Sequence, residues 1–276
     1  MNKRTSGKNF TKYLILILIS MIFLFPFLFL ISTSLKSMDE AFSNSFHLIP
    51  QTIHWDNYIK AFQKIPFLTY TKNTVVITLI NVIGQLIVCP MIAYGLSKIE
   101  WIGKKIIFGI ILATMLIPYQ VTMIPVYMIW NKLNLVGTII PITLPAFFGN
   151  AFYIIILTQF FKTIPNSILE AAKIDGASEF RIYSKIVLPL CKPALATVAI
   201  FTFLNTWSDF LGPLLYLTEQ KSWTLSIGLQ QYMSAHYVEW TLLMAASAMF
   251  TIPIVILFFF AQKKFVEGIV TTGLKD

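Results

Sequence analysis

Residues 74–96 read TVVITLINVIGQLIVCPMIAYGL, a run of 23 residues without a charged side chain. At 1.5 Å per residue, a helix of this length crosses the roughly 30 Å of hydrocarbon in a bilayer. A backbone in hydrocarbon must satisfy its own hydrogen bonds, which only helices and closed barrels achieve. Barrel strands alternate polar and apolar residues, whereas apolar stretches such as 14–19 and 252–260 show no alternation. The run therefore predicts a membrane-spanning helix.

Five further runs of this kind follow the same argument, and none contains Lys or Arg: 13–31, 106–128, 138–160, 193–217 and 241–261. The whole chain agrees, because 57% of its 276 residues are hydrophobic and only 12% are charged, against about 25% charged in a typical soluble domain. A soluble enzyme, a secreted disulfide scaffold and a nucleic-acid-binding module fit this composition poorly. The sequence predicts an all-α integral membrane protein with six transmembrane helices spanning residues 13–262.

The basic residues indicate which side each loop lies on. Fifteen of the 21 Lys and Arg residues fall in segment 1–12, in the loop before the third run, in the loop 161–192 and in the tail 263–276. By the positive-inside rule, both termini and the loop 161–192 are expected to be cytoplasmic. The net charge of +9 is explained by this excess of Lys and Arg in cytoplasmic loops, and it does not indicate nucleic-acid binding. The rival interpretation of residues 1–31, a cleaved signal peptide, needs a shorter apolar region and an A-x-A site. The outer loop 32–73 is expected to form short interfacial helices.

Polar residues share a helical face within two of the spans. Thr78, Asn81 and Gln85 do so in the second span, and Thr202, Asn205, Thr206 and Asp209 do so in the fifth. An acid at mid-bilayer costs about 2.5–3.5 kcal/mol on insertion scales, so Asp209 is expected to face a cavity or a partner. Two interpretations stay open for these residues, a lining of a translocation pathway and structural pairing between helices. The candidate pathway residues are Asn81, Gln85, Asn205, Ser208 and Asp209.

Signatures of catalysis, metal binding and nucleotide binding are missing from the sequence. There is no G-x-x-x-x-G-K-[ST], H-E-x-x-H or G-x-S-x-G, and His47, His54 and His236 have no metal-ligand spacing. We therefore predict no catalytic residue, no metal and no cofactor on this chain, so energy for uphill transport would come from another subunit. Cys89 and Cys191 suggest no disulfide framework.

The loop 161–192 reads FKTIPNSILEAAKIDGASEFRIYSKIVLPLCK and predicts two short helices. Pro165 suits a helix start, Ser167 and Glu170 have capping-box spacing, and Gly176 suits a helix stop. Ser178 can begin a second helix that Pro189 ends. The residues alone leave two possibilities open: a knob that seats in a groove of another protein, or an amphipathic pair resting on lipid headgroups.

A family resemblance decides between them. Glu170-Ala171-Ala172-x-x-Asp175-Gly176-Ala177, followed by Ile186-x-Leu188-Pro189, resembles the EAA loop of the permeases of importer-type ABC transporters. Three other segments resemble sugar-importer permeases of the maltose G-subunit type: Asn57-Tyr58-Ile59-x-Ala61-Phe62, Trp207-Ser208-Asp209-Phe210-x-x-Pro213 and Phe265-Val266-x-Gly268. The sequence departs from that family at Ser208, where Asn is usual, and in its final residues.

The resemblance implies a type I ABC importer permease whose two-helix loop couples it to a cytoplasmic ATP-binding subunit dimer. Glu170 would make the polar contact, Ala171 and Ala172 would allow close approach, and Asp175, Gly176 and Ala177 would form the turn. ATP and Mg would be bound by that partner. A second permease, an extracytoplasmic solute-binding protein, a sugar substrate and a bacterial plasma membrane are also implied. The alternatives are an importer of amino acids or polyamines, a self-sufficient channel or ion-coupled carrier, and a membrane-embedded enzyme.

Overall fold

The computed structural model describes residues 4–43, 47–233 and 237–273, and the side chains of residues 12–262 outside the gaps. His236 and the side chains of the tail motif that begins at Phe265 lie outside the described residues. The chain divides into two compact units, which we describe separately. The first contains Met1–Phe67 and Gly228–Pro253, and the second contains Leu68–Ile227 and Ile254–Asp276.

The first unit contains a long apolar helix, two short helices, a 3₁₀ turn and the first part of a second long helix. They are α1 (Arg4–Ser34), α2 (Met38–Ala41), α3 (Asp56–Lys64), a 3₁₀ turn (Leu229–Tyr232) and the first part of α15 (Trp240–Gly273). The helices α2 and α3 confirm that the loop 32–73 forms short helices. The buried Asn57 amide donates to the carbonyl oxygens of Ser34 and Lys36 at 2.9 and 2.8 Å, so the Asn57 motif fastens α3 to the end of α1.

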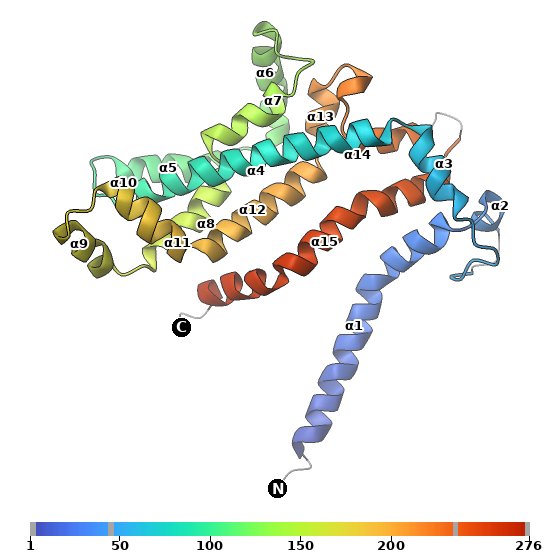
Figure 1. Cartoon of the computed structure of the whole chain (residues 1–276), viewed down its shortest axis with the longest axis horizontal. Coiled ribbons are helices and arrows are strands. Elements are labelled where there is room, and N and C mark those ends of the chain that lie inside the picture. Colours follow the sequence, from blue (N-terminus) through green and yellow to red (C-terminus); the bar gives the residue numbers. More distant parts are fainter. Residues whose placement is uncertain (1–3, 44–46, 234–236, 274–276) are drawn as a thin grey trace. The chain divides into compact units, whose positions relative to one another are not determined.

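The second unit is built around four helices, which Figure 1 shows side by side: α4 (Phe67–Ser97), α5 (Lys104–Thr114), α8 (Ala151–Lys162) and α12 (Lys192–Trp207). The other elements are α6 (Tyr119–Lys132), α7 (Ile140–Thr143), a 3₁₀ turn (Leu144–Phe148), α9 (Asn166–Ile174), α10 (Glu179–Ile182), a π-helical turn (Tyr183–Val187), α11 (Leu188–Leu190), α13 (Leu211–Tyr216), a 3₁₀ turn (Gln220–Ser222) and α14 (Leu225–Gly228). The core of this unit lies between α4, α8, the α10–α11 segment and α12.

Among the described residues, four helical stretches can each cross a membrane by length and composition: Lys12–Ser34, Phe67–Ser97, Ile140–Lys162 and Trp240–Gln262. Two bent helix pairs would bring the number to six, in line with the six predicted spans. These pairs are α5 with α6, bent by 99°, and Glu179–Leu190 with Lys192–Trp207, bent by 78°. The all-helical membrane fold predicted from the sequence is confirmed.

Three predicted spans need correction, because none of them is a continuous helix. The run 138–160 breaks at Gly149-Asn150, between a 3₁₀ turn and the start of α8. The run 106–128 breaks before α6, where Pro118 is extended at φ −62° and ψ 138° and has no N–H to continue the α5 ladder. The run 193–217 breaks after Trp207, and only the six residues of α13 follow. There the Asp209 carboxylate accepts the Gly212 N–H at 3.1 Å, which gives the backbone an alternative to helical bonding.

Candidate functional site

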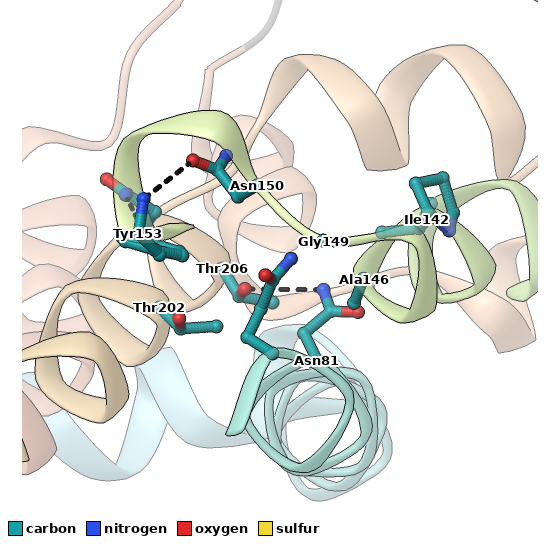
Figure 2. Close-up of a pocket in the computed structure, with 11 residues that line it drawn as sticks. Asn81, Ile142, Ala146, Gly149, Asn150, Tyr153, Thr202 and Thr206 are labelled. Carbon is teal, nitrogen blue, oxygen red and sulfur yellow. Dashed lines mark hydrogen bonds between the residues drawn. The ribbon is translucent and has the colours of Figure 1, made fainter. Parts of the chain in front are cut away.

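A polar pocket lies between α4, the α7–α8 segment and α12 in the second unit. Its volume is about 290 Å³. Figure 2 shows side chains from all three elements around it. The lining residues are Asn81, Gln85, Ile142, Pro145, Ala146, Gly149, Asn150, Tyr153, Thr202, Asn205 and Thr206. None of them carries a formal charge.

The structure brings three of the five candidate pathway residues into this pocket. Asn81 and Gln85 are buried on one face of α4, and Asn205 is exposed on α12. Ser208 and Asp209 do not line the pocket. Ser208 donates its hydroxyl to the Leu204 carbonyl, and the Asp209 carboxylate turns back toward Gly212. The pathway role of Ser208 and Asp209 stays a prediction.

Hydrogen bonds between helices fix the pocket walls. The Asn81 amide nitrogen donates to the Thr206 hydroxyl at 3.3 Å, joining α4 to α12 (Figure 2). The Asn205 amide nitrogen donates to the Tyr153 hydroxyl at 3.0 Å, joining α12 to α8. The Asn81 carbonyl oxygen is buried and has no hydrogen-bond partner among the described residues. A buried acceptor without a partner is unusual in native proteins, and this one lies in the wall of a pocket.

Asn150 and Tyr153 are site residues that the sequence analysis missed. Gly149 has φ +84°, which starts a new helix direction, and the Asn150 side chain caps α8 by accepting from the N–H groups of Phe152 and Tyr153. Asn is a preferred N-cap residue, so Gly149-Asn150 was a readable signal for the helix start. The start of α8 faces Asn81 because of tertiary packing, and no local sequence signal predicts that packing.

A fully buried thiol links the pocket to α8. Cys89 donates to the Gln85 side-chain oxygen at 2.8 Å, and the Asn150 N–H approaches the same sulfur at 3.4 Å. Cys89 and Cys191 are both free and buried, so they act as packing residues. No group of three or more His, Cys, Asp or Glu within the described residues could hold a metal ion.

The loop 161–192 presents the predicted two-helix element with a sharp turn. The Gly176 N–H donates to Lys173 and the Ala177 N–H donates to Ala172, both at 3.0 Å. This pair of bonds is a Schellman motif, which satisfies the last carbonyls of α9. Gly176 has φ +78°, a conformation that costs a residue with a Cβ about 1–2 kcal/mol. The predicted stop at Gly176 is therefore confirmed.

The six predicted coupling residues lie together at this turn. Glu170, Ala171, Asp175 and Gly176 are exposed, whereas Ala172 and Ala177 are half-buried and pack against the core. The large apolar side chains Ile174 and Phe180 are 87% and 70% exposed beside them. Small residues flanked by exposed apolar side chains form a surface suited to close approach by another molecule.

Two details of the loop differ from the prediction. The predicted capping box is absent, because Pro165 is the N-cap of α9 and no side chain caps it; Ser167 therefore lies two residues beyond the N-cap position. The second helix does not end at Pro189 but runs through a π-helical turn to Leu190. Pro189 sits in the first turn of α11, where its missing N–H is tolerated. The predicted cap at Ser178 is present, with the hydroxyl oxygen accepting the Arg181 N–H.

The inner face of the loop is fastened to the helices. Ile164 and Leu169 are buried in the core cluster with Phe161 and Val187. The Lys98 ammonium donates to the Ile164 carbonyl at 2.6 Å and to the Asn166 side chain at 2.8 Å. These contacts tie α9 to the end of α4.

A second tie joins α4 to α10. The Tyr94 hydroxyl donates to Glu179 at 2.7 Å, and Lys173 pairs with the same carboxylate at 2.6 Å. The Lys173 ammonium and the Tyr94 hydroxyl hold the pKa of the Glu179 carboxyl below its ordinary value. Glu179 therefore stays ionised at neutral pH and keeps both contacts.

The Lys98 contacts predict a measurable loosening when they are removed. Lys98→Met keeps most of the side-chain length but loses both hydrogen bonds, so amide exchange in α9 should accelerate roughly fivefold, which corresponds to about 1 kcal/mol. Hydrogen–deuterium exchange mass spectrometry of the purified protein measures this. Lys60→Met is a matched control, since Lys60 pairs with Asp56 on α3. Unchanged exchange in α9 would show that Lys98 does not hold the loop.

The chain matches one family model and several known transport proteins. The family model described as "binding-protein-dependent transport system inner membrane component" matches residues 86–270. An arabinooligosaccharide transport permease of Halalkalibacterium halodurans is 35% identical and covers 93% of each chain. A probable permease for starch degradation products of Thermoanaerobacterium thermosulfurigenes is 32% identical over 94% of each chain.

A solved structure is similar over nearly the whole chain. It is a bacterial ABC transporter involved in the import of the acidic polysaccharide alginate, matched with a TM-score of 0.82 and 26% identity over 95% of this chain and 98% of that one. The family predicted from the sequence is confirmed, and the chain is a multi-pass membrane protein of the kind whose relatives are transporter permeases rather than enzymes. This chain belongs to the inner membrane components of binding-protein-dependent transport systems.

Proposed function

We propose that the chain is a permease subunit of an ATP-driven importer of sugars. In this proposal it forms the translocation pathway with a second permease and receives solute from an extracytoplasmic binding protein. A separate cytoplasmic subunit dimer binds ATP and Mg and carries out hydrolysis, and this chain binds no cofactor. The observation that carries the proposal is the two-sided loop: its outer face, Glu170 and Ala171, is exposed, while its inner face is fixed to the helices that line the pocket.

The same helices connect the loop to the pocket. Helix α4 contacts the loop through Tyr94 and Lys98 and lines the pocket with Asn81 and Gln85. Helix α8 likewise contributes Phe161 to the core beneath the loop and Tyr153 to the pocket. Because packed helices move as rigid elements, a displacement of the loop moves two pocket walls. Glu170 is then the polar contact with the ATPase, and Gly176 keeps the turn sharp.

The character of the pocket supports sugars over the alternative solutes. Amino acids and polyamines are ionised, and sites for them are expected to offer charge-assisted hydrogen bonds. The lining amides and hydroxyls are neutral, and each can bond a sugar hydroxyl. No Asp, Glu, His, Lys or Arg is among the lining residues, which disfavours a proton-coupled carrier. Two relatives are named for oligosaccharide and starch-product transport, which supports the same substrate class.

The placement in the membrane follows the charge distribution. With most Lys and Arg in 1–12, 161–192 and 263–276, both termini and the coupling loop are placed in the cytoplasm. The membrane is the bacterial plasma membrane, and the loop 32–73 faces outward.

Uptake in cells tests the proposal. A strain lacking this chain, complemented with a tagged copy, should take up labelled saccharides but not amino acids or polyamines, and ATP depletion should stop that uptake. The tagged chain should also co-purify with a nucleotide-hydrolysing subunit. In liposomes the purified chain alone should move none of these solutes. Transport by the chain alone, or restored uptake of amino acids instead of saccharides, would contradict the proposal.

A further inference from the structure

We propose that the α4–α8–α12 pocket is a binding subsite for uncharged saccharides and that it rejects saccharides carrying carboxylates. The inference rests on the proposed function and adds the charge class of the substrate. Similarity to known proteins does not fix the charge of the substrate. A solved structure similar to this chain belongs to a transporter involved in the import of an acidic polysaccharide.

The lining supplies hydrogen bonds of both kinds. Seven polar side chains line the pocket, and all of them are amides or hydroxyls: Asn81, Gln85, Asn150, Tyr153, Thr202, Asn205 and Thr206. A sugar hydroxyl both donates and accepts, so it pairs with either end of an amide and with any hydroxyl. Of the four amides, Asn81 and Gln85 lie on α4, Asn205 lies on α12 and Asn150 caps α8, and all four converge on one volume.

One acceptor in this wall has no hydrogen-bond partner among the described residues, and neighbouring atoms cover it. The Asn81 amide nitrogen is engaged with Thr206, but its carbonyl oxygen is buried without a partner among the described residues. Leaving such an acceptor unpaired costs about 1–3 kcal/mol, and rotation of the Asn81 side chain to meet a sugar hydroxyl would remove that cost. Figure 2 shows Asn81 and Thr206 pointing toward one another at the pocket edge, with Ala146 beyond them.

The remaining wall suits the apolar side of a sugar ring. Ile142, Pro145 and Ala146 offer carbon surface, and Gly149 has no side chain to fill the space. A volume of about 290 Å³ is at the low end of the roughly 300–1,000 Å³ of small-molecule sites. The pocket therefore suits one sugar unit of a longer chain rather than a whole oligosaccharide.

A carboxylate has no counter-charge in this pocket. No Lys, Arg or His is among the lining residues, and removing an ionised carboxylate from water without a paired cation is strongly unfavourable. The fifth span adds no cation, since it contains no Lys, Arg or His, and its one acid, Asp209, faces Gly212. The pocket thus discriminates by charge.

The test uses the purified transporter complex without its solute-binding protein, so that the binding protein does not impose its own selectivity. Equilibrium binding of labelled arabinotriose, xylotriose and maltotriose is compared with that of trigalacturonate and trimannuronate. At least one neutral trisaccharide should bind, and both uronates should bind at least tenfold more weakly. Equal or tighter binding of a uronate would overturn the inference and leave a sugar importer intact. Binding of no saccharide, together with no saccharide uptake in cells, would overturn both proposals.

Variants separate a subsite from a structural contact. Asn81→Leu removes the free carbonyl at nearly constant volume and should weaken neutral trisaccharide binding about three- to tenfold. Asn205→Leu should do the same. Its side chain is exposed, so the substitution leaves no buried polar group of its own, although it also removes the bond to Tyr153. Gln159→Leu is the matched control, because Gln159 is an exposed amide on α8 that does not line the pocket. If Asn205→Leu folds and binds neutral trisaccharide as the control does, the pocket is not the subsite.

Discussion

Gly176→Pro is expected to abolish solute uptake while the chain still inserts in the membrane. Proline fixes φ near −65°, whereas Gly176 has φ +78°. Proline also removes the N–H that donates to the Lys173 carbonyl at 3.0 Å. The end of α9 must then unwind, and the Glu170–Ala171 surface loses its position relative to the helices beneath. Uptake should fall at least tenfold, and the co-purified ATPase subunit should be lost.

Other substitutions at the same position separate backbone geometry from bulk. A Cβ at Gly176 would meet no atom within 4 Å, so only the left-handed conformation is at issue. Asn adopts that conformation more readily than other residues. Gly176→Asn should therefore keep most uptake, and Gly176→Val should lose much of it. Full uptake and full ATPase recovery in the proline variant would show that this turn does not couple the subunits.

Gly84→Leu is expected to lower the melting temperature of the purified chain by roughly 2–12 °C. A Cβ at Gly84 would lie 3.1 Å from the Ala146 Cβ, 3.1 Å from the Phe147 ring and 3.2 Å from the Ala146 backbone carbon. The backbone atom cannot move aside as a side chain does, so α4 and the 144–148 turn must separate beside the pocket. Overpacking of this kind costs about 1–3 kcal/mol, and each kcal/mol shifts the melting temperature by roughly 2–4 °C in a domain of this size.

Gly95 offers a control on the same helix. Nothing lies within 4 Å of a Cβ at Gly95, and replacing a helical glycine gains about 0.5–1 kcal/mol of helix stability. Gly95→Leu should therefore leave the melting temperature unchanged or slightly higher. Thermal unfolding in detergent, followed by scanning fluorimetry, measures both variants. Equal melting temperatures for Gly84→Leu and Gly95→Leu would mean that α4 and the 144–148 turn do not make a close contact in the protein.

The helical membrane fold could be predicted because apolar runs long enough to cross a bilayer have few other solutions. The bends between consecutive helices could not be predicted in this way. Pro118 signals a break in the third run, but the 99° between α5 and α6 depends on what each helix packs against. The end of α12 was missed for a different reason: Asp209 binds the N–H of Gly212 through its side chain, and such local competition with the helix is invisible to a count of apolar residues.

The candidate site was predictable only where it follows helical periodicity. Asn81 and Gln85 share a face at i and i+4 within a long regular helix, so their common orientation was correct. Pathway lining and structural pairing were both open for Asp209 because it is an acid in an apolar run. The chain has left α12 by that point, so Asp209 does not line the pocket with Asn205. Asn150 and Tyr153 complete the pocket from α8, and their alignment with α4 depends on packing around Cys89 that pairs residues 61 positions apart.

The two cysteines give the native protein its own reporters of motion. Cys89 touches the pocket wall, and Cys191 precedes α12 within the core beneath the loop; both have no exposed surface. A maleimide can reach either sulfur only when the surrounding helices part. The rate of thiol labelling during turnover therefore tells when the bundle opens at each level, without engineering a single residue.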